Sequence, residues 1–434
     1  MPHVISLTDG TTTVSLTTLG IGLINYVPSA PKAGASSVTD SIKIVFYGST
    51  TAEMQGKINA VERLFTHAAR RSMSGAGARV FLQFQPIGEA TTWRSNVYSG
   101  MVMLDDDALT VFGQARIQAE IVLTRAPYWE GARTQIPLSN PNGSNNTAGL
   151  TINNGATNYA NIAASSVVGA MPAPLEVRMR NTSGAGRGYY GFHIAVNTFA
   201  QTAAYHIEGE ARTNGRPTAT LAGASGGSIV KAENTSPIDL AFNLPATTLS
   251  AYAGRWVHVL ARIASLFDGG QPLYAWAQLY DYYGLVSLYR TPMITPLATT
   301  HITDFGMIPL PPGGSNGGNW AQMVLRLWFQ GAPTLSVWLD YLAFAPAEER
   351  FYRYMVQRGM QVLDQDWVVD DGIENQQYLI ESGANHPIYT SITSPVHVMP
   401  NADQRLYVWQ EGYGARADWA MQVQAFYRPR RSTL

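Results

Sequence analysis

The feature that most constrains the fold of this chain is one amphipathic helix set among segments of alternating hydrophobicity, between residues 41 and 131. Ser49, Thr50 and Thr51 are residue types that cap a helix N-terminus, and Gly75 is the type that most often ends a helix. The apolar residues between these ends recur every three or four positions: Met54, Ile58, Val61, Phe65 and Ala68. A helix of about 20 residues with one apolar stripe has to pack that stripe against an apolar surface.

The segments on either side of the helix supply that surface. Apolar residues recur at every second position in residues 42–46, 80–84 and 115–123, which is the period of a strand with one face in water. We therefore predict an α+β unit, in which an antiparallel sheet or barrel carries one flanking helix. A hairpin turn is expected at residues 105–107, where three aspartates follow one another. Three carboxylates at a loop tip are more often solvated than bound to a cation, so we favour the solvated state.

The composition indicates that the rest of the 434 residues is mainly β. Only 14% of the residues are charged, compared with about a quarter in an average soluble domain, and Gly, Ser, Thr, Asn and Pro fill the difference. The net charge of -1 gives no reason to expect recognition of nucleic acid or of an acidic membrane. The absence of cysteine excludes disulfides and thiolate metal sites.

The sequence also lacks the signals of membrane insertion and of export. No stretch approaches the roughly 18 consecutive apolar residues of a membrane-spanning helix, so we expect no membrane insertion. Residues 1–7 lack the basic start and the apolar centre of a secretory signal peptide. We therefore expect a soluble protein that is not exported by such a signal.

The chain before the helix begins with a hairpin signal. Asp9 and Gly10 lie between two short apolar segments, which is a strong signal for two antiparallel strands and a tight turn. Residues 17–40 contain two prolines and several small residues. They are expected either to form an extended arm that packs on a neighbouring subunit or to be a plain connecting loop.

Two further domains follow the helix-containing domain, which we assign to residues 1–132. Residues 133–174 are rich in Asn, Gly, Thr, Ser and Ala and open the second domain. Residues 175–346 read as short strands separated by Gly, Ser and Asn turns, which is typical of a two-sheet sandwich of jelly-roll type. Residues 347–434 are β again, but about 80 residues are few for an independent domain.

The C-terminal segment is therefore expected to complete the second domain by pairing with strands from residues 135–168. The sandwich of residues 175–346 would then be an insertion in a split domain made of residues 133–174 and 347–434. Residues 405–409 and 419–427 both read as strands, and we predict that they form a closing hairpin.

The motif at residues 125–131, Arg-Ala-Pro-Tyr-Trp-Glu-Gly, followed by Pro-Leu-Ser-Asn at residues 137–140, resembles the distal tail protein family of long-tailed bacteriophages. The resemblance covers residues 1–170 and extends to the C-terminal 80. It implies an N-terminal domain of tail-tube type, a β-barrel or sandwich with one flanking helix, that forms a ring, commonly a hexamer. It also implies a galectin-like β domain that projects from the ring.

The resemblance also implies partners and a location. A distal tail protein joins the tail tube to the hub and tape-measure proteins of the tail tip, so the chain would be a virion protein made in the host cytoplasm. The family has no catalytic residues to carry over, and no cofactor apart from the metal considered next.

The insertion resembles a second group of proteins. Residues 337–342, Val-Trp-Leu-Asp-Tyr-Leu, followed by Pro346, resemble the final strand of carbohydrate-binding jelly rolls. In those modules an acidic residue in this strand often helps to hold a structural calcium ion, and Asp340 is the matching position. The resemblance implies that the insertion touches carbohydrate on the host surface.

Aromatic residues next to loops are the candidates for that contact, because an aromatic face stacks on the apolar face of a pyranose. Most tryptophans of the insertion lie in alternating strands and are expected in the core. The candidates beside loops are Tyr280, Tyr282, Tyr283 and Trp320.

The sequence gives no signal for catalysis. Glycoside hydrolysis needs two facing carboxylates about 5–10 Å apart, and no spacing selects a pair here. The histidines lack metal-ligand spacing, and no Gly-x-Ser-x-Gly motif occurs. We therefore expect no enzyme activity. The alternatives to a tail-tip component are a free carbohydrate-binding or glycan-degrading protein and a receptor-binding tip protein.

Overall fold

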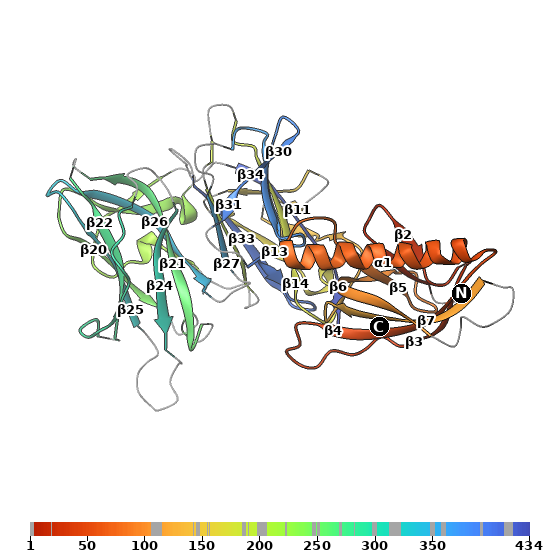
Figure 1. The fold of residues 1–434 in the computed structure, drawn as a ribbon. Coiled ribbons are helices and arrows are strands. Elements are labelled where there is room, and N and C mark those ends of the chain that lie inside the picture. The colour runs from red at the N-terminus through yellow and green to blue at the C-terminus, as the bar shows by residue number, and fades with distance from the viewer. Residues whose placement is uncertain are drawn as a thin grey trace. The chain divides into compact units, whose positions relative to one another are not determined.

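The computed structural model divides the chain into two compact units, which are drawn as ribbons in Figure 1. Unit 1 comprises Met1–Thr134, Val168–Pro172 and Arg428–Leu434, and unit 2 comprises Gln135–Val167 and Ala173–Tyr427. The structure describes residues 4–434 apart from residues 19, 106–114, 142, 145–147, 154, 156, 185–187, 190, 198–205, 222–223, 245–248, 250–251, 269–270, 282, 297–301, 312–322, 348–351, 357–361, 391–393 and 412–419.

Unit 1 is built on an antiparallel sheet with the strand order β2-β1-β5-β6-β7-β4-β3. The strands of this path are β1 (Val4–Thr8), β2 (Thr13–Ser15), β3 (Ile21–Tyr26), β4 (Val38–Gly48), β5 (Val80–Gln85), β6 (Trp93–Leu104) and β7 (Ala115–Arg125). Two short strands, β8 (Trp129–Glu130) and β35 (Arg430–Arg431), pair with each other, and β8 also pairs with β6. The last residues of the chain therefore belong to the same sheet as the first.

The helix α1 (Thr51–Ser74) packs against this sheet, as predicted (Figure 1). The Thr50 side chain accepts a hydrogen bond of 3.1 Å from the backbone N–H of Glu53, and Gly75 ends the helix in the left-handed conformation. Glu53 also pairs with Lys57 at 2.8 Å, one turn further along the helix. The buried residues form the predicted stripe with the addition of Leu64: Met54, Ile58, Val61, Leu64, Phe65 and Ala68.

Gly100 of β6 allows α1 to approach the sheet closely. A Cβ atom on Gly100 would stand 2.5 Å from the ring of Phe65, which is closer than carbon atoms can approach without a shift. Gly56 of α1, in contrast, has open space where its Cβ would stand. The two glycines therefore differ in what an added methyl group would meet.

Gly100→Ala is expected to lower the free energy of unfolding by about 1–3 kcal/mol, because the methyl group overpacks the contact with Phe65. The matched control Gly56→Ala is expected to raise it by about 0.5–1 kcal/mol, because alanine loses less backbone entropy in a helix. Chemical denaturation followed by circular dichroism measures both changes. Stabilisation by both substitutions would contradict the close approach of α1 to β6.

The N-terminal segment forms the predicted hairpin. β1 pairs with β2 around Asp9 and Gly10, and the Asp9 carboxylate accepts the backbone N–H groups of Thr11 and Thr12 at 3.0 and 2.7 Å. The following segment is more than the arm or loop expected from the sequence, because it contains β3, which pairs with β4 of the same chain. Its apolar alternation is too short to be seen among the prolines and small residues around it.

Unit 2 contains a first sandwich, whose two antiparallel sheets share one core. The sheets have the orders β11-β10-β13-β33-β16-β27-β31 and β12-β34-β15-β28-β29-β30. Their strands are β10 (Leu138–Asn140), β11 (Gly143–Ser144), β12 (Leu150–Asn153), β13 (Tyr159–Ile162), β15 (Glu176–Asn181), β16 (Gly191–Asn197), β27 (Tyr352–Val356), β28 (Trp367–Asp371), β29 (Gln376–Glu381), β30 (Ala384–Pro387), β31 (Tyr389–Thr390), β33 (Gln404–Glu411) and β34 (Ala420–Tyr427). Short elements complete this part of the chain: β9 (Thr134–Gln135), the turn η2 (Ala164–Ser166), β14 (Ala173–Pro174) and β32 (His397–Val398).

The strand pairing places β15 and β16 in this first sandwich. β15 pairs with β28 and β34, and β16 pairs with β27 and β33. The predicted boundary of the insertion at residue 175 therefore differs from the pairing, which puts both strands with the split domain. Alternating hydrophobicity identifies a strand but does not tell which sheet the strand joins.

The predicted closing hairpin of the C-terminal segment is wrong for the same reason. β33 lies between β13 and β16, whereas β34 lies between β12 and β15 in the other sheet. The two segments are strands, as predicted, and each pairs with a strand of residues 135–168.

The insertion forms a second sandwich in unit 2, with sheets of order β18-β19-β26-β21-β24 and β20-β25-β22-β23. β17 pairs with β26. Apolar residues of both sheets form one core cluster. The elements are β17 (His206–Glu208), η4 (Gly209–Ala211), β18 (Thr218–Thr220), η5 (Ser225–Gly227), β19 (Ser228–Ala232), β20 (Ile238–Leu244), β21 (Arg255–Phe267), β22 (Tyr274–Tyr280), β23 (Ser287–Arg290), β24 (Ile302–Leu310), β25 (Met323–Gln330) and β26 (Ser336–Pro346).

The fold class is mainly β, with antiparallel sheets and one α-helix among the described residues, which confirms the prediction from composition and periodicity.

Candidate functional sites

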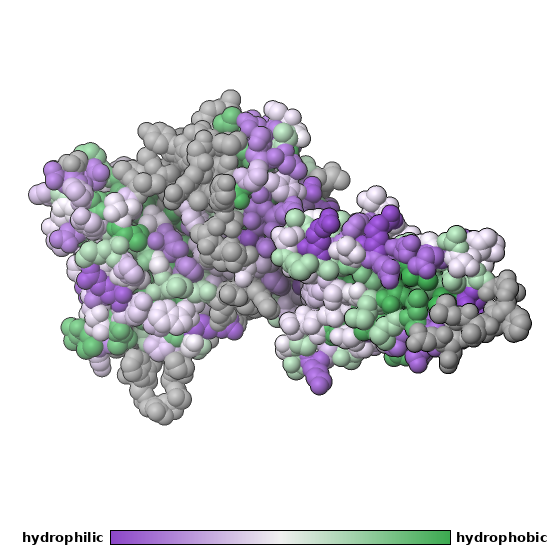
Figure 2. All heavy atoms as spheres, in the orientation of Figure 1, coloured by the Kyte–Doolittle hydropathy of each residue, from purple (hydrophilic) through white to green (hydrophobic). Residues whose placement is uncertain are grey.

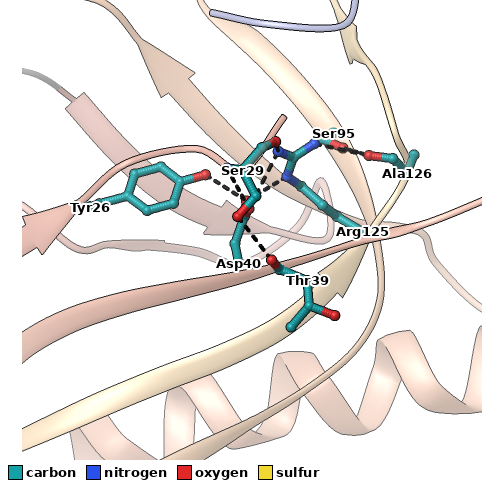
Figure 3. Close-up of polar contacts among 7 residues, drawn as sticks. All are labelled: Tyr26, Ser29, Thr39, Asp40, Ser95, Arg125 and Ala126. Atoms are coloured by element: carbon teal, nitrogen blue, oxygen red, sulfur yellow. Dashed lines mark hydrogen bonds and ion pairs between the residues drawn. The ribbon is translucent and has the colours of Figure 1, made fainter. Parts of the chain in front are cut away.

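The first residue of the motif at 125–131 forms a buried ion pair in unit 1 (Figure 3). Arg125 at the end of β7 is fully buried, and its Nε atom lies 2.5 Å from Oδ2 of Asp40, which is 1% exposed on the neighbouring strand β4. The guanidinium also lies over the ring of Trp129, 4.4 Å from the centroid. A buried carboxylate and a buried guanidinium are each costly without a partner, so the two groups have to be kept together.

The ion pair holds the connection between β3 and β4. The Asp40 carboxylate accepts the Tyr26 hydroxyl at 2.8 Å and the Ser29 backbone N–H at 2.9 Å. Arg125 in turn donates to the Ser29 carbonyl at 3.0 Å. Burial, together with the adjacent Asp40 carboxylate, raises the pKa of Tyr26, so that its hydroxyl stays a donor. The network therefore ties the start of this loop to the centre of the sheet.

The same arginine fixes the turn that follows β7. Its Nη1 atom donates to the Ala126 carbonyl at 2.9 Å, and the Ser95 hydroxyl donates to the same carbonyl at 3.0 Å (Figure 3). Each side chain of this network has its hydrogen-bond or ion-pair partners within unit 1. The site is structural in character, because it leaves no nucleophile or base directed at solvent.

The remaining residues of the motif contact the C-terminal residues of the chain. Arg430 pairs with Glu130 at 2.6 Å and lies over the ring of Tyr128, 3.9 Å from its centroid. Arg431 pairs with Glu89 at 3.1 Å. The Gly131 backbone N–H donates to the Pro429 carbonyl at 2.8 Å. These contacts therefore hold the basic C-terminal residues in unit 1.

One face of the unit 1 sheet exposes large apolar side chains. Gly100 points toward Phe65 of α1, and the alternation of β6 therefore turns Met101 and Met103 to the other face. Met101 is 57% exposed and Met103 is 44% exposed. Ile24 of the edge strand β3 is 52% exposed. In Figure 2, hydrophobic residues also lie next to hydrophilic ones on the side of unit 1 on which α1 is visible.

A hollow of about 290 Å³ lies on this part of unit 1. Ile24, Met103 and Leu104 line it, together with Glu120, the cross-strand partner of Met103, and Lys43, the partner of Glu120 on the next strand. Exposed apolar groups surrounded by charged ones are typical of a surface that another protein covers.

The structure places two of the four predicted glycan-binding residues, and it does not bring them together with a polar site. Tyr280 at the end of β22 is half-buried beneath the Arg326 guanidinium, which lies 5.0 Å from its ring centroid. Tyr283 is 71% exposed in the following turn. Tyr282 and Trp320 lie outside the described residues.

The other tryptophans of the insertion differ in their exposure. Trp276 is buried and stacks on its cross-strand partner Trp328, with 6.0 Å between the ring centroids. Trp338 is half-buried beneath Lys231. Trp256 is 46% exposed near the start of β21, which differs from the core position expected for it. Its strand turns this side chain outward, since Val257 and Val259 face the core.

Asp340 lies in the core of the second sandwich, in an ion pair with Arg262 of β21. Asp340 is fully buried and its Oδ2 atom lies 2.5 Å from Nη1 of Arg262. Burial raises the pKa of Asp340 to about 6, against the opposing effect of the guanidinium. The second oxygen, Oδ1, has no hydrogen-bond partner.

A polar cluster on β17 and η5 lies in the same sheet region. The Glu208 carboxylate accepts the Ser225 hydroxyl at 2.8 Å and lies 2.8 Å from Nε2 of His206. Sequence reasoning missed this trio, because Ser225 lies 17 residues after Glu208 and 19 residues after His206 in the chain. Ser225 and Glu208 both meet the same ring nitrogen of His206, whereas a catalytic relay needs them on opposite nitrogens.

The described residues do not supply a set of metal ligands at Asp340. One carboxylate oxygen each of Glu208, Glu210 and Asp340 is buried and lacks a hydrogen-bond partner. Even so, no three His, Cys, Asp or Glu side chains in the described part of the chain are arranged to hold a metal ion. Asp340 has the Arg262 guanidinium as its cation, and the structural calcium remains a prediction from the resemblance. The aspartates expected at the 105–107 turn lie outside the described residues from residue 106 on.

Arg262→Met is expected to lower the free energy of unfolding at pH 7 by about 2–3 kcal/mol, because Asp340 loses its buried partner. The deficit should shrink as the pH falls from 7 to 4. The folded-state pKa of Asp340 lies above its ordinary value, so the cost of the ionised form is present at high pH and disappears as Asp340 takes up a proton. Denaturant unfolding at several pH values measures this, with the exposed Arg290→Met as a control. A deficit that does not change with pH would contradict the role of Asp340.

Two acidic residues of the insertion, Asp281 and Asp304, are each engaged in structural contacts. Asp281 accepts the backbone N–H groups of Leu285 and Val286 in a turn, and Asp304 pairs with His258 at 2.9 Å. Glu348 and Glu349 lie outside the described residues. The expected lack of enzyme activity stays a prediction.

Comparisons with known proteins give a faint structural likeness. Scans of the sequence against protein-family models and against curated proteins give no match. Two solved structures align over 100% of both chains. One is the "Structure of the Phage P2 Baseplate in its Activated Conformation with Ca", at 8% identity and a TM-score of 0.28. The other is the "Structure of the phage p2 baseplate in its activated conformation with Sr", at 7% identity and a TM-score of 0.26. Likeness at these TM-scores does not by itself establish a shared fold.

Among the described residues, no helix is both long and apolar enough to span a membrane.

Proposed function

We propose that this chain is a structural component of a phage tail tip, in which copies of unit 1 form a ring between the tail tube and the tip proteins. The proposal includes a hexameric ring, contacts with the tube, hub and tape-measure proteins, and a location in the virion. Its function is assembly and not turnover. The proposal starts from the resemblance of residues 125–131 and 137–140 to distal tail proteins and from the surface of unit 1.

The observation that carries the proposal is the edge strand β3. β3 has the sequence Ile-Gly-Leu-Ile-Asn-Tyr, and at the described residues it pairs with β4 alone. Soluble proteins protect such edges with charges, proline or a covering element, and β3 carries neither a charged residue nor a proline. Its Ile24 is 52% exposed. A neighbouring copy that covers this edge would remove the risk of uncontrolled pairing.

The apolar face beside this edge supports the same assembly. Met101, Met103 and Ile24 expose large apolar side chains next to the charged residues Lys43 and Glu120. At the other end of the sheet order, β2 is a second edge. Because the two edges differ, contact between one and the other is heterologous, and heterologous contacts close into rings when the rotation between copies allows it.

Electron microscopy of the purified full chain tests this proposal. Ring-shaped particles with an axial opening are expected, with a rotational symmetry that class averages reveal. Single particles of one chain that also hydrolyse polysaccharide would favour the alternative of a free glycan-degrading protein. Trimeric, elongated particles would favour a receptor-binding tip protein.

The second part of the proposal is that the insertion in unit 2 binds carbohydrate on the host surface. A ring would present several such domains together, so that weak single sites would give useful avidity. The test of this part does not depend on ring formation, because carbohydrate binding can be measured on the chain in any assembly state.

A further inference from the structure

We propose that the insertion binds an uncharged saccharide in a hollow at the start of β22, against the exposed ring of Tyr274. This inference deepens the proposed carbohydrate binding and rests on it. It places the site away from the aromatic residues that the sequence suggested. Tyr274 is the first residue of β22 and Tyr280 is the last, so about 20 Å of strand separate the two positions.

The hollow has the size and the lining of a small-molecule site. Its volume is about 730 Å³, within the range of about 300–1,000 Å³ that is typical of ligand pockets. Tyr274 is 45% exposed, and Met293 is 52% exposed. The polar side chains of the lining are the amides of Gln271 and Gln330. None of the residues that line the hollow carries a charge.

This lining matches the chemistry of a pyranose. The C–H groups on one face of a sugar ring stack on an aromatic ring, and its hydroxyl groups exchange hydrogen bonds with amides. Gln330 is the cross-strand partner of Tyr274, so its amide and the phenol ring stand next to each other on the sheet. A site without a charged side chain offers no compensation for an anionic sugar, so the ligand class is a neutral saccharide.

The walls of the hollow are held by backbone and side-chain hydrogen bonds. Next to Met293, Ile294 exchanges two backbone hydrogen bonds with Ala275, at 2.8 and 2.9 Å. On the other wall, the Ser236 hydroxyl donates to the Gly331 carbonyl at 2.8 Å. The site is therefore largely formed before a ligand arrives, which lowers the entropy cost of binding.

Gly331 on one wall lies against residues 272 and 273 on the other. A Cβ atom on Gly331 would stand 3.4 Å from the Leu273 side chain, beside the Pro272 carbonyl. Pro272 and Pro333 flank the hollow and restrict the backbone on both sides of it. The sequence gives no sign of this arrangement, because its residues come from three separate segments.

Saturation-transfer NMR and isothermal titration calorimetry of the full chain test the inference. The probes are maltotriose, cellotriose and N,N′,N″-triacetylchitotriose as neutral saccharides, and a sialylated and a sulfated trisaccharide as charged ones. Binding of at least one neutral probe is expected, with stronger binding than either charged probe. Tyr274→Ala should weaken it at least tenfold, whereas Tyr274→Phe, which keeps the stacking ring, should change it less than threefold.

Tyr283→Ala is the matched control, because Tyr283 is an exposed tyrosine near the other end of the same strand. Loss of binding in Tyr283→Ala with retention in Tyr274→Ala would overturn the inference in favour of the loop site. Absence of binding to every neutral probe, or preference for a charged one, would overturn it as well. Ring formation is measured separately, so failure here and failure of the assembly proposal can be told apart.

Discussion

Arg125→Met is expected to lower the free energy of unfolding of unit 1 by about 3–5 kcal/mol. The substitution keeps most of the side-chain volume and removes the positive charge that lies 2.5 Å from Asp40. The Asp40 carboxylate would then be buried without a charged partner, and the Ser29 and Ala126 carbonyls would each lose a donor. Urea denaturation followed by tryptophan fluorescence measures the change, since Trp129 lies against the guanidinium.

The matched control for this prediction is Arg116→Met. Arg116 lies on the same strand, β7, but is exposed, so its replacement is expected to change the stability by less than about 0.5 kcal/mol. If Arg125→Met were as mild as Arg116→Met, the network of Figure 3 would not stabilise the loop between β3 and β4.

Replacement of both Met101 and Met103 by aspartate is expected to abolish self-association of the chain. Each substitution puts a charge on the exposed apolar face, and burying an unpaired carboxylate in an interface costs several kcal/mol. Two such penalties together are more free energy than an interface of ordinary affinity can lose and still hold. Analytical ultracentrifugation at matched concentrations measures the change, and the doubly substituted chain should sediment as a single copy.

Met73→Asp is the control for this second prediction. Met73 lies near the end of α1 and is 83% exposed, so the substitution adds a charge to unit 1 away from the apolar face. It is expected to leave the assembly intact. Dissociation caused equally by Met73→Asp would mean that charge itself, and not the apolar face, decides the association state.

The local part of the fold could be predicted from the sequence. The caps and the stripe of α1 are determined by residues within about 25 positions of one another, and the structure confirms them. The same is true of the hairpin at Asp9 and Gly10. These features depend on the residue order itself, because the interacting groups are neighbours in the chain.

Pairing between distant strands could not be predicted in this way. β15 reads as a good strand, but its partners β28 and β34 lie almost 200 and 250 residues further on. No local pattern selects them among the other alternating segments. The sequence therefore could not predict where the insertion begins, or that β33 and β34 lie in different sheets.

The candidate sites show the same difference between what the sequence predicts and what only the structure reveals. The motif at residues 125–131 stood out in the sequence, but the reason for its residue types appears only in the structure, where Arg125 meets Asp40 and Glu130 meets Arg430. Both partners are far away in the chain. Tyr274 has no distinguishing neighbour in the sequence, since its hollow is assembled from three segments.

The mass of the purified chain in solution tests the assembly proposal most directly. One copy has a mass of 47.2 kDa, and sedimentation equilibrium or native mass spectrometry gives the number of copies without a model of their shape. A ring predicts a discrete species at a fixed multiple of this mass, six copies if the ring is a hexamer, that persists on dilution into the micromolar range. A species of 47.2 kDa at all concentrations would contradict the ring.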